Sequence, residues 1–183
     1  MKLRRYFILI FKKIIKTYFL IRLKNHILFN KKVVIFDIDN TLANTWPSLK
    51  LDYKSTNERL KNLNIFQNIF DLIQNYITSD NEIVFLSARN YTTYFVSKQW
   101  LKKNGFSKFL LILVESPKEK LFFLKCIKNK KIIFYDDMSY GHESGKIHYY
   151  ESEITQIKKL HNVEYYGYDF LLKLQNKDIN EKI

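Results

Sequence analysis

The sequence predicts an α/β fold, with one central parallel sheet and helices on both of its faces. Four short apolar runs predict buried strands, at residues 33–36, 83–86, 110–114 and 132–135. Segments of helical character separate them, at about residues 55–78, 91–104 and 117–129. Strands that alternate with helices form parallel sheets through right-handed crossovers, which gives the predicted three-layer arrangement.

Composition indicates one folded domain and an unusual N-terminus. The chain has 183 residues, of which 46% are hydrophobic and 27% charged, and 4 Gly and 2 Pro indicate no flexible linker. Residues 1–36 hold ten Lys or Arg and no Asp or Glu, whereas the rest holds 21 basic and 18 acidic residues. A uniformly basic nucleic-acid-binding domain is therefore not indicated.

Residues 1–30 are expected to form a basic amphipathic helix ahead of a catalytic domain at 31–183, which should fold without it. Its apolar face is Leu3, Phe7, Ile10, Phe11, Ile14, Tyr18 and Ile21, and its basic face is Lys2, Arg5, Lys12, Lys13, Lys16 and Lys24. The longest uncharged run, Tyr6 to Phe11, is too short to span a membrane. Two interpretations stay open. Residues 1–29 bind an anionic membrane surface, or their apolar face packs on the body or on a second subunit of a homo-oligomer.

Local signals place the remaining elements. Ser116 is a candidate N-cap, with Pro117 in the first helical turn and Glu119 completing a capping box, and Gly105 is a candidate helix stop. Towards the C-terminus we expect a strand near 148–150, a helix near 153–161 and an edge strand at 163–166. Cys126 is the single cysteine of the chain, so an internal disulfide is excluded, and we expect this side chain to be buried. The absence of an internal disulfide fits a protein of the cytoplasm, either in solution or bound peripherally at the inner face of the membrane.

Polar residues follow three of the four apolar runs. They are Asp37-Ile38-Asp39-Asn40-Thr41, Ser87-Ala88-Arg89 and Asp136-Asp137. Ligands of parallel sheets bind outside the carboxyl ends of the strands, so these groups should meet at one edge. Carboxylates gathered there would repel each other unless a hard divalent cation lay among them, and oxygen ligands favour Mg²⁺.

The residue types also suit phosphoryl transfer. Asp37 can attack phosphorus, and Asp39 can protonate the leaving oxygen and later deprotonate water. The Ser87 hydroxyl and the ammonium of Lys118 or Lys120 can hold the phosphoryl oxygens. Asp136 and Asp137 can anchor the metal.

Phe36-Asp37-Ile38-Asp39-Asn40-Thr41-Leu42 resembles the first motif of the haloacid dehalogenase-like superfamily. Ser87 resembles the second motif, a lysine near the start of the 117–129 helix the third, and Asp136-Asp137 the fourth, in family order over residues 33 to about 151. The resemblance implies a Rossmann-like three-layer sandwich and a magnesium-dependent phosphatase that forms an aspartyl-phosphate.

The resemblance also implies roles for individual residues. Asp37 is the nucleophile and Asp39 the general acid/base, and a carboxylate at position 39 points to the phosphatases of the superfamily. The metal ligands are Asp37, the backbone carbonyl of Asp39 and an acidic residue of the fourth motif. Tyr135 replaces the glycine often found before that motif, which leaves the choice between Asp136 and Asp137 open.

Four residues are candidates for binding the substrate phosphate: Ser87, Lys120, Arg89 and Thr41. Lys118 and Lys120 point about 200° apart on a helix, so only one should face the site, and we favour Lys120. Arg89 either binds substrate phosphate in bidentate fashion or pairs with a surface carboxylate.

The spacing leaves no room for a large cap domain. Only 45 residues separate Thr41 from Ser87, and 32 separate Ser87 from Lys120. We expect an open site with a small flap at Asn44–Tyr53, where Trp46 stacks on a substrate ring or packs inside the protein. The predicted function is hydrolysis of a phosphomonoester whose class is not specified. The alternatives are a nucleic-acid end phosphatase and a non-catalytic module that binds membrane or a partner.

Overall fold

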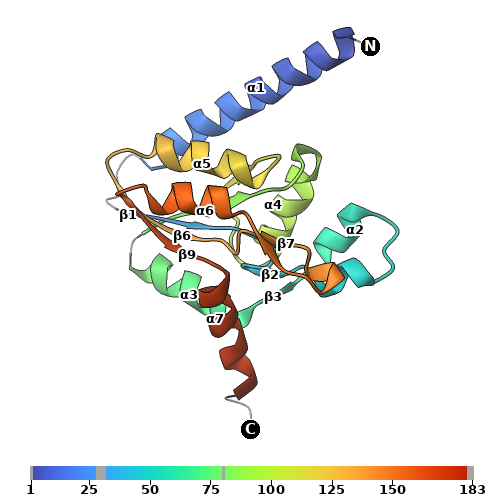
Figure 1. The fold of residues 1–183 in the computed structure, drawn as a ribbon, viewed down its shortest axis with the longest axis vertical. Helices are drawn as coiled ribbons and strands as arrows, with labels where there is room; N and C mark the ends of the chain where they lie inside the picture. The colour runs from blue at the N-terminus through green and yellow to red at the C-terminus, as the bar shows by residue number, and fades with distance from the viewer. Residues whose placement is uncertain (1, 28–31, 80, 181–183) are drawn as a thin grey trace.

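The computed structural model describes residues 2–27, 32–79 and 81–180, and it confirms the predicted three-layer architecture (Figure 1). The central sheet has five parallel strands in the order β5-β4-β1-β6-β9. Their bounds are β1 Lys32–Phe36, β4 Glu82–Ser87, β5 Leu110–Leu113, β6 Lys131–Tyr135 and β9 Val163–Tyr166. The strand expected near 148–150 does not join this sheet.

The centre of the sheet is the core of the protein. β1 lies between β4 and β6, with Phe36 in register with Phe85 and Tyr135. Residues Val33 to Phe36 are buried, because helices cover both faces of a parallel sheet. Continuous apolar runs therefore identified these strands correctly.

Helices form the outer layers (Figure 1). α5 Pro117–Cys126 and α6 Glu151–Lys158 cover one face, and α3 Gln67–Thr78 and α7 Tyr168–Asn180 cover the other. The expected 91–104 helix consists of a short 3₁₀ turn, η2 Tyr91–Thr93, followed by α4 Tyr94–Lys103. The sequence did not predict α7, and Cys126 at the end of α5 is half-buried rather than buried.

The capping box predicted at α5 forms differently. Ser116 occupies the N-cap position, but its side chain makes no capping hydrogen bond. Glu119 instead accepts a hydrogen bond from the backbone N–H of Glu115, at 2.9 Å. The helix still begins at Pro117, whose fixed φ suits the first turn.

The predicted 55–78 helix is divided in two. α2 Thr56–Lys61 ends before β3 Asn64–Ile65, which pairs antiparallel with β2 Ala43–Asn44. The indole N–H of Trp100 donates to the carbonyl of Leu63 at 2.9 Å, so that carbonyl has a partner outside any helix. β2 and the 3₁₀ turn η1 Pro47–Lys50 place the expected flap beside the carboxyl end of β1.

A second small hairpin follows β6. β7 Ser139–Tyr140 pairs antiparallel with β8 His148–Tyr149 across the 3₁₀ turn η3 His142–Ser144. Gly141 lies at φ 80°, and a Cβ atom there would meet the carbonyl oxygen of Lys146 at 2.5 Å. This turn therefore depends on glycine, and β8 belongs to the hairpin rather than to the central sheet.

The N-terminal helix, α1 Lys2–His26, packs through a face that the sequence pattern did not identify. Phe19, Leu23 and the following Ile27 are buried against the body, whereas the predicted apolar face is exposed at Phe7, Ile10, Phe11, Ile14, Tyr18 and Ile21. None of the helices in the described part of the chain has the length and apolar character needed to cross a membrane. The side chains of Lys2, Leu3 and Arg5 lie outside the described residues.

Part of the predicted basic face is turned towards α5. Lys12 pairs with Glu115 at 2.5 Å and Lys16 with Glu119 at 3.8 Å, and the Lys16 ammonium lies 4.0 Å from the centre of the Phe122 ring. These contacts lie on the same side of α1 as the buried Phe19 and Leu23, so the other side of the helix faces solvent. Towards its N-terminus, α1 extends past α5 (Figure 1).

Candidate active site

Three buried carboxylates meet at the carboxyl edge of the sheet. Asp37 follows β1, and Asp136 and Asp137 follow β6, the neighbouring strand. A backbone hydrogen bond of 2.9 Å from the N–H of Asp37 to the carbonyl of Tyr135 fixes the two strand ends together. One ligand atom from each carboxylate lies within 4.8 Å of the others. In the part of the chain that the structure describes, no other group of three metal-ligating side chains lies as close.

Lys120 reaches this cluster from α5. Its ammonium lies 2.6 Å from Asp136 Oδ2 and 3.2 Å from Asp37 Oδ1, and the side chain is 2% exposed. Lys118, by contrast, is 75% exposed and lies 3.9 Å from Glu153. Of the two lysines that the sequence left as alternatives, the structure brings only Lys120 to the cluster.

The cluster carries more negative charge than Lys120 neutralises. Burial raises the pKa of Asp37 to about 7 although Lys120 acts in the opposite direction, and Asp136 and Asp39 raise it further. Burial, with Asp136 and Asp37 close by, also raises the pKa of Asp137 well above its usual value. Burial alone would lower the pKa of Lys120, but Asp136 and Asp37 raise it above its usual range.

One oxygen of Asp37 has no hydrogen-bond donor. Lys120 forms an ion pair with Oδ1, but the contact lacks the geometry of a hydrogen bond, so this buried oxygen has no donor. A buried carboxylate oxygen without a hydrogen-bond donor is costly, and a cation would compensate for the missing donor. Three buried carboxylates and this oxygen fit a hard divalent cation such as Mg²⁺.

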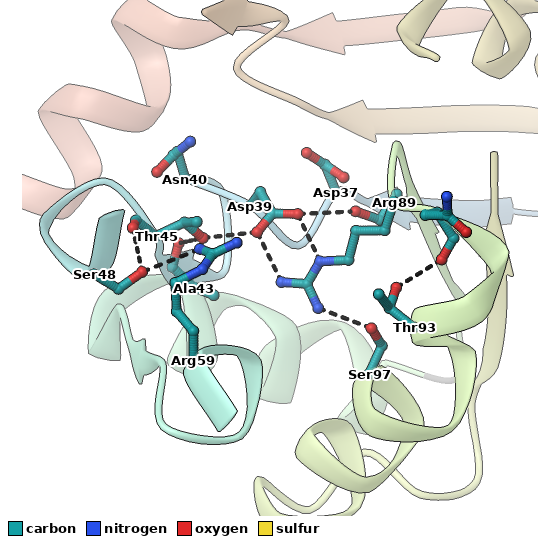
Figure 2. Close-up of polar contacts among 12 residues, drawn as sticks. Asp37, Asp39, Asn40, Ala43, Thr45, Ser48, Arg59, Arg89, Thr93 and Ser97 are labelled. Carbon is teal, nitrogen blue, oxygen red and sulfur yellow. Dashed lines mark hydrogen bonds and ion pairs between the residues drawn. The ribbon is translucent and has the colours of Figure 1, made fainter. Parts of the chain in front are cut away.

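Asp39 takes a different environment from Asp37 (Figure 2). Its carboxylate accepts hydrogen bonds from Arg89 Nε at 2.6 Å, from Arg89 Nη2 at 2.7 Å and from Thr45 Oγ1 at 2.8 Å. Burial would raise the pKa of Asp39, but the charge and hydrogen bonds of Arg89 outweigh it and lower that pKa. The two carboxylates of the Asp-x-Asp motif therefore differ in their hydrogen-bond partners, and their pKa values are shifted in opposite directions.

The open space beside these groups is a cavity of about 330 Å³, whose lining includes Asp37, Asp39, Lys120, Asp136 and Asp137. Three candidates for phosphate binding are not among the lining residues. Ser87 is buried, 3.5 Å from Asp39 Oδ2. Thr41 is buried and accepts a hydrogen bond from the N–H of Asp137 at 3.3 Å. For Arg89 the sequence left two roles open, binding of substrate phosphate or pairing with a surface carboxylate. In the structure Arg89 pairs with a carboxylate, but its partner is Asp39 rather than a surface residue.

The structure also shows residues to which the sequence assigned no role. Ser139 Oγ donates to Asp137 Oδ2 and lies 2.7 Å from His142 Nε2. The His142 ring stacks on Trp46, with centroids 4.1 Å apart, so the flap packs on the β7–β8 hairpin. Trp46 thus packs on one side against His142 and also belongs to the lining of the cavity. The only available sequence signal was that residues 139 and 142 follow the Asp136-Asp137 pair closely.

Comparison with known proteins gives a family. The model of the LNS2 domain of PITM 1-3 matches residues 34–164, which is more than half of the chain and includes every side chain of the cluster. No match was found among curated proteins. The LNS2 domain has a haloacid dehalogenase-like fold of the phosphatase type, in agreement with the superfamily that the motifs indicated. The chain therefore belongs to the LNS2 domain family.

Proposed function

We propose that the protein is a magnesium-dependent phosphomonoester hydrolase that forms an aspartyl-phosphate on Asp37. The observation that carries this proposal is the position of Asp37. Its carboxylate lines a cavity in one cluster with Lys120, Asp136 and Asp137. Membership of a family with a phosphatase-type fold supports it.

The reaction has two steps. In the first, an oxygen of Asp37 bonds to phosphorus as the bond to the ester oxygen breaks. The ester oxygen receives a proton from Asp39, which has to leave Arg89 and take up that proton beforehand, because the ion pair with Arg89 lowers the pKa of Asp39. In the second, water attacks the aspartyl-phosphate, gives its proton to Asp39, and inorganic phosphate and free Asp37 are released. Lys120 places positive charge beside the transferred group.

Magnesium would be held by Asp37, by the backbone carbonyl of Asp39, and by Asp136 or Asp137. When bound, it neutralises charge on the phosphoryl oxygens. Asp136 accepts from Lys120 and from the N–H of Met138, and Asp137 accepts from Ser139. Both carboxylates are therefore held in place before a cation arrives.

The test is release of phosphate from an aryl phosphate with and without magnesium, followed by a screen of phosphorylated sugars, nucleotides and oligonucleotide ends. We expect magnesium-dependent turnover of the aryl ester. If neither the aryl ester nor any compound of the screen is hydrolysed, the protein is a non-catalytic binding module. An oligonucleotide end is not the favoured substrate, because Lys120 is the only cationic side chain in the lining of the cavity that the structure describes.

The two lysines of α5 give a matched pair of variants. Lys120→Ala should lower kcat/KM by about 10²-fold or more, because it removes the charge beside Asp37. Lys118→Ala should stay within about twofold of wild type, since that side chain is exposed and directed towards Glu153. Initial rates measure both, with circular dichroism to confirm folding and Lys120→Arg as a variant that keeps the charge. Loss of activity in Lys118→Ala alone would reverse the assignment.

We also propose that α1 attaches the protein peripherally to an anionic membrane at the cytoplasmic face. Six apolar side chains on one side of α1 are exposed in this structure: Phe7, Ile10, Phe11, Ile14, Tyr18 and Ile21. Lys13 and Lys24 are exposed beside them, and residues 1–36 contain no acidic residue to oppose an anionic surface. An exposed apolar stripe with flanking lysines suits the interface of such a membrane.

Full-length variants test this, because Phe19 and Leu23 pack on the body and truncation would expose the core. We expect the protein to sediment with phosphatidylcholine vesicles that contain phosphatidylserine, less with phosphatidylcholine alone, and less at high salt. The double variant Ile14→Ser and Ile21→Ser should weaken vesicle binding tenfold or more. The reason is that each apolar side chain buried in the membrane interface contributes about 1.5–3 kcal/mol to the free energy of binding. The control, Leu49→Ser, changes an exposed apolar residue of the flap. The proposal would be refuted if all variants sedimented equally with the vesicles, or if no variant sedimented. If wild type instead formed a dimer whose amount rose with protein concentration, and Ile14→Ser abolished that dimer, the stripe would be a subunit interface.

A further inference from the structure

A second cavity lies next to the catalytic one, and aromatic side chains form much of its wall. It has a volume of about 350 Å³ and lies between the end of β8, α6, the end of β9 and the start of α7; the last three are the orange and red elements of Figure 1. Its aromatic lining residues are Tyr149, Tyr165, Tyr166, Tyr168 and Phe170. Asp137 belongs to the lining of both cavities, so the two are neighbours.

The rings meet at angles instead of stacking flat on each other. The centroids of Tyr149 and Tyr168 are 5.8 Å apart and their planes are inclined by 66°. Tyr166 and Phe170 are 4.5 Å apart with an angle of 51°. Tyr149 and Phe170 are also 36% and 40% exposed, so these rings are not filled in by the core. Rings arranged in this way offer aromatic surface to a ligand in the cavity.

The charges around the Tyr149–Tyr168 corner are negative. Glu151 and Asp169 line the cavity from the first turns of α6 and α7, and within the described residues neither forms an ion pair. Burial raises the pKa of Tyr149, and Asp169, Tyr168 and Glu151 raise it further, so both carboxylates act on this hydroxyl. Lys158, the one cation in the lining that the structure describes, is two helical turns from Glu151, about 10 Å at about 1.5 Å per residue.

This combination selects among the possible ligands. An anion would be repelled by Glu151 and Asp169, and a neutral apolar ligand would leave their charges unbalanced. A bare divalent cation needs several oxygen ligands close together, and in the described part of the chain only the catalytic carboxylates form such a group. An organic ammonium ion uses both features, because its charge is attracted by carboxylates and by the faces of aromatic rings, on which its methyl groups also pack.

We propose that the second cavity binds an organic ammonium group of the choline type. The methylated nitrogen lies against the rings of Tyr149 and Tyr168, and Glu151 and Asp169 balance its charge. The inference does not rest on the proposed phosphatase activity. Because Asp137 lines both cavities, the ammonium belongs either to a separate small molecule or to the far end of a phosphorylated substrate.

The first experiment compares choline with neohexanol, its neutral analogue in which carbon replaces the nitrogen. Full-length protein with isotope-labelled tyrosine is titrated with each compound, and the ring signals are followed by NMR. We expect choline to bind at least tenfold more tightly than neohexanol, because only choline carries the charge. The signals of Tyr149 and Tyr168 should shift, and that of Tyr6, an exposed tyrosine of α1, should not.

Variants at exposed positions locate the site. Tyr149→Leu and Asp169→Asn should each weaken choline binding by about fivefold or more, whereas Tyr149→Phe, which keeps the ring, should stay within about twofold of wild type. Tyr6→Leu and Asp71→Asn are the matched controls, because they make the same changes at exposed residues outside the lining of the cavity. Circular dichroism confirms folding of every variant.

A second experiment identifies the source of the ammonium by comparing hydrolysis of phosphocholine with that of neohexyl phosphate. If the substrate carries the ammonium, kcat/KM should be at least tenfold higher for phosphocholine, and Asp169→Asn should remove that preference. If choline binds but the two esters react equally, the ammonium is that of a separate ligand. If neither ester is hydrolysed, the result counts against the proposed phosphatase activity, and the choline titration still tests the cavity.

Three results would overturn the inference. The first is equal binding of choline and neohexanol, or no binding of either. The second is wild-type affinity for choline in both Tyr149→Leu and Asp169→Asn, which would place the ammonium elsewhere. The third is a shift of the Tyr149 and Tyr168 signals by inorganic phosphate but not by choline, which would mean that the starts of α6 and α7 bind an anion.

Discussion

An Asp37→Asn protein is expected to fold normally and to hydrolyse no phosphate ester above background. The amide oxygen of asparagine is a poor nucleophile, so the first step loses the group that bonds to phosphorus. Removal of a covalent nucleophile should lower kcat by at least about 10³-fold. Folding should not suffer, because burial raises the pKa of Asp37 to about 7 and its ionised form is therefore unfavourable in the cluster.

The measurement combines initial rates, thermal denaturation and mass spectrometry of acid-quenched protein. Wild type should carry one phosphoryl group on the peptide that contains Asp37, and the variant none. Asp52→Asn, at an exposed position of the flap region, is the matched control and should retain activity. Wild-type rates in a folded Asp37→Asn protein would mean that another group attacks phosphorus.

Removal of divalent metal should likewise abolish turnover and should also lower stability. Without a cation, Asp37, Asp136 and Asp137 repel one another in a buried site. A ligand at 100 times its Kd stabilises the folded protein by about 2.7 kcal/mol, which corresponds to roughly 5–10 °C in Tm for a chain of this size. Magnesium should therefore raise Tm, and excess chelator should reverse both the shift and the activity.

The pH dependence of this shift has a definite sign. Magnesium binds the ionised carboxylates, and the pKa of Asp37 is raised from 3.8 to about 7. Protons therefore compete with the metal below about pH 7, so magnesium affinity should rise between pH 5 and pH 8. Asp136→Asn and Asp137→Asn should reduce the shift, and Asp71→Asn, on the exposed side of α3, should not. Full activity in excess chelator, or a Tm that does not respond to magnesium, would exclude the metal site.

The sheet and the carboxylate cluster could be predicted because both follow from short-range rules. Val33 to Phe36 are apolar on both faces of the strand, which identifies a central strand of a parallel sheet. Asp37 and Asp136 follow neighbouring strands, so topology alone brings them to one edge. Helix geometry predicted that only one of Lys118 and Lys120 faces the site, and the structure places Lys120, the one we favoured, in the cluster.

The remaining features depend on partners that the sequence does not reveal. Arg89 and Asp39 are 50 residues apart, and their pairing depends on side-chain orientation at the ends of two strands. α1 packs through Phe19 and Leu23, and its Lys12 and Lys16 pair with Glu115 and Glu119 beside that contact. The sequence pattern counted only the larger apolar stripe. The hydrogen bond from Trp100 to the carbonyl of Leu63 likewise joins residues far apart in sequence.

The packing of α1 fixes this helix to the body of the protein, so α1 is not a flexible N-terminal arm. The helix has 25 residues, about 37 Å at about 1.5 Å per residue. Phe19 and Leu23 in its C-terminal part are buried, and its N-terminal part extends past α5 (Figure 1). A surface bound to the exposed stripe would hold the body at one tilt rather than let it tumble. Lys12 also pairs with Glu115, a residue in the lining of the cavity, so α1 and the cavity are fixed in position relative to each other. On such a surface, the protein would meet substrates by diffusion in the plane of the membrane. The opening of the cavity would then keep one constant orientation towards that surface.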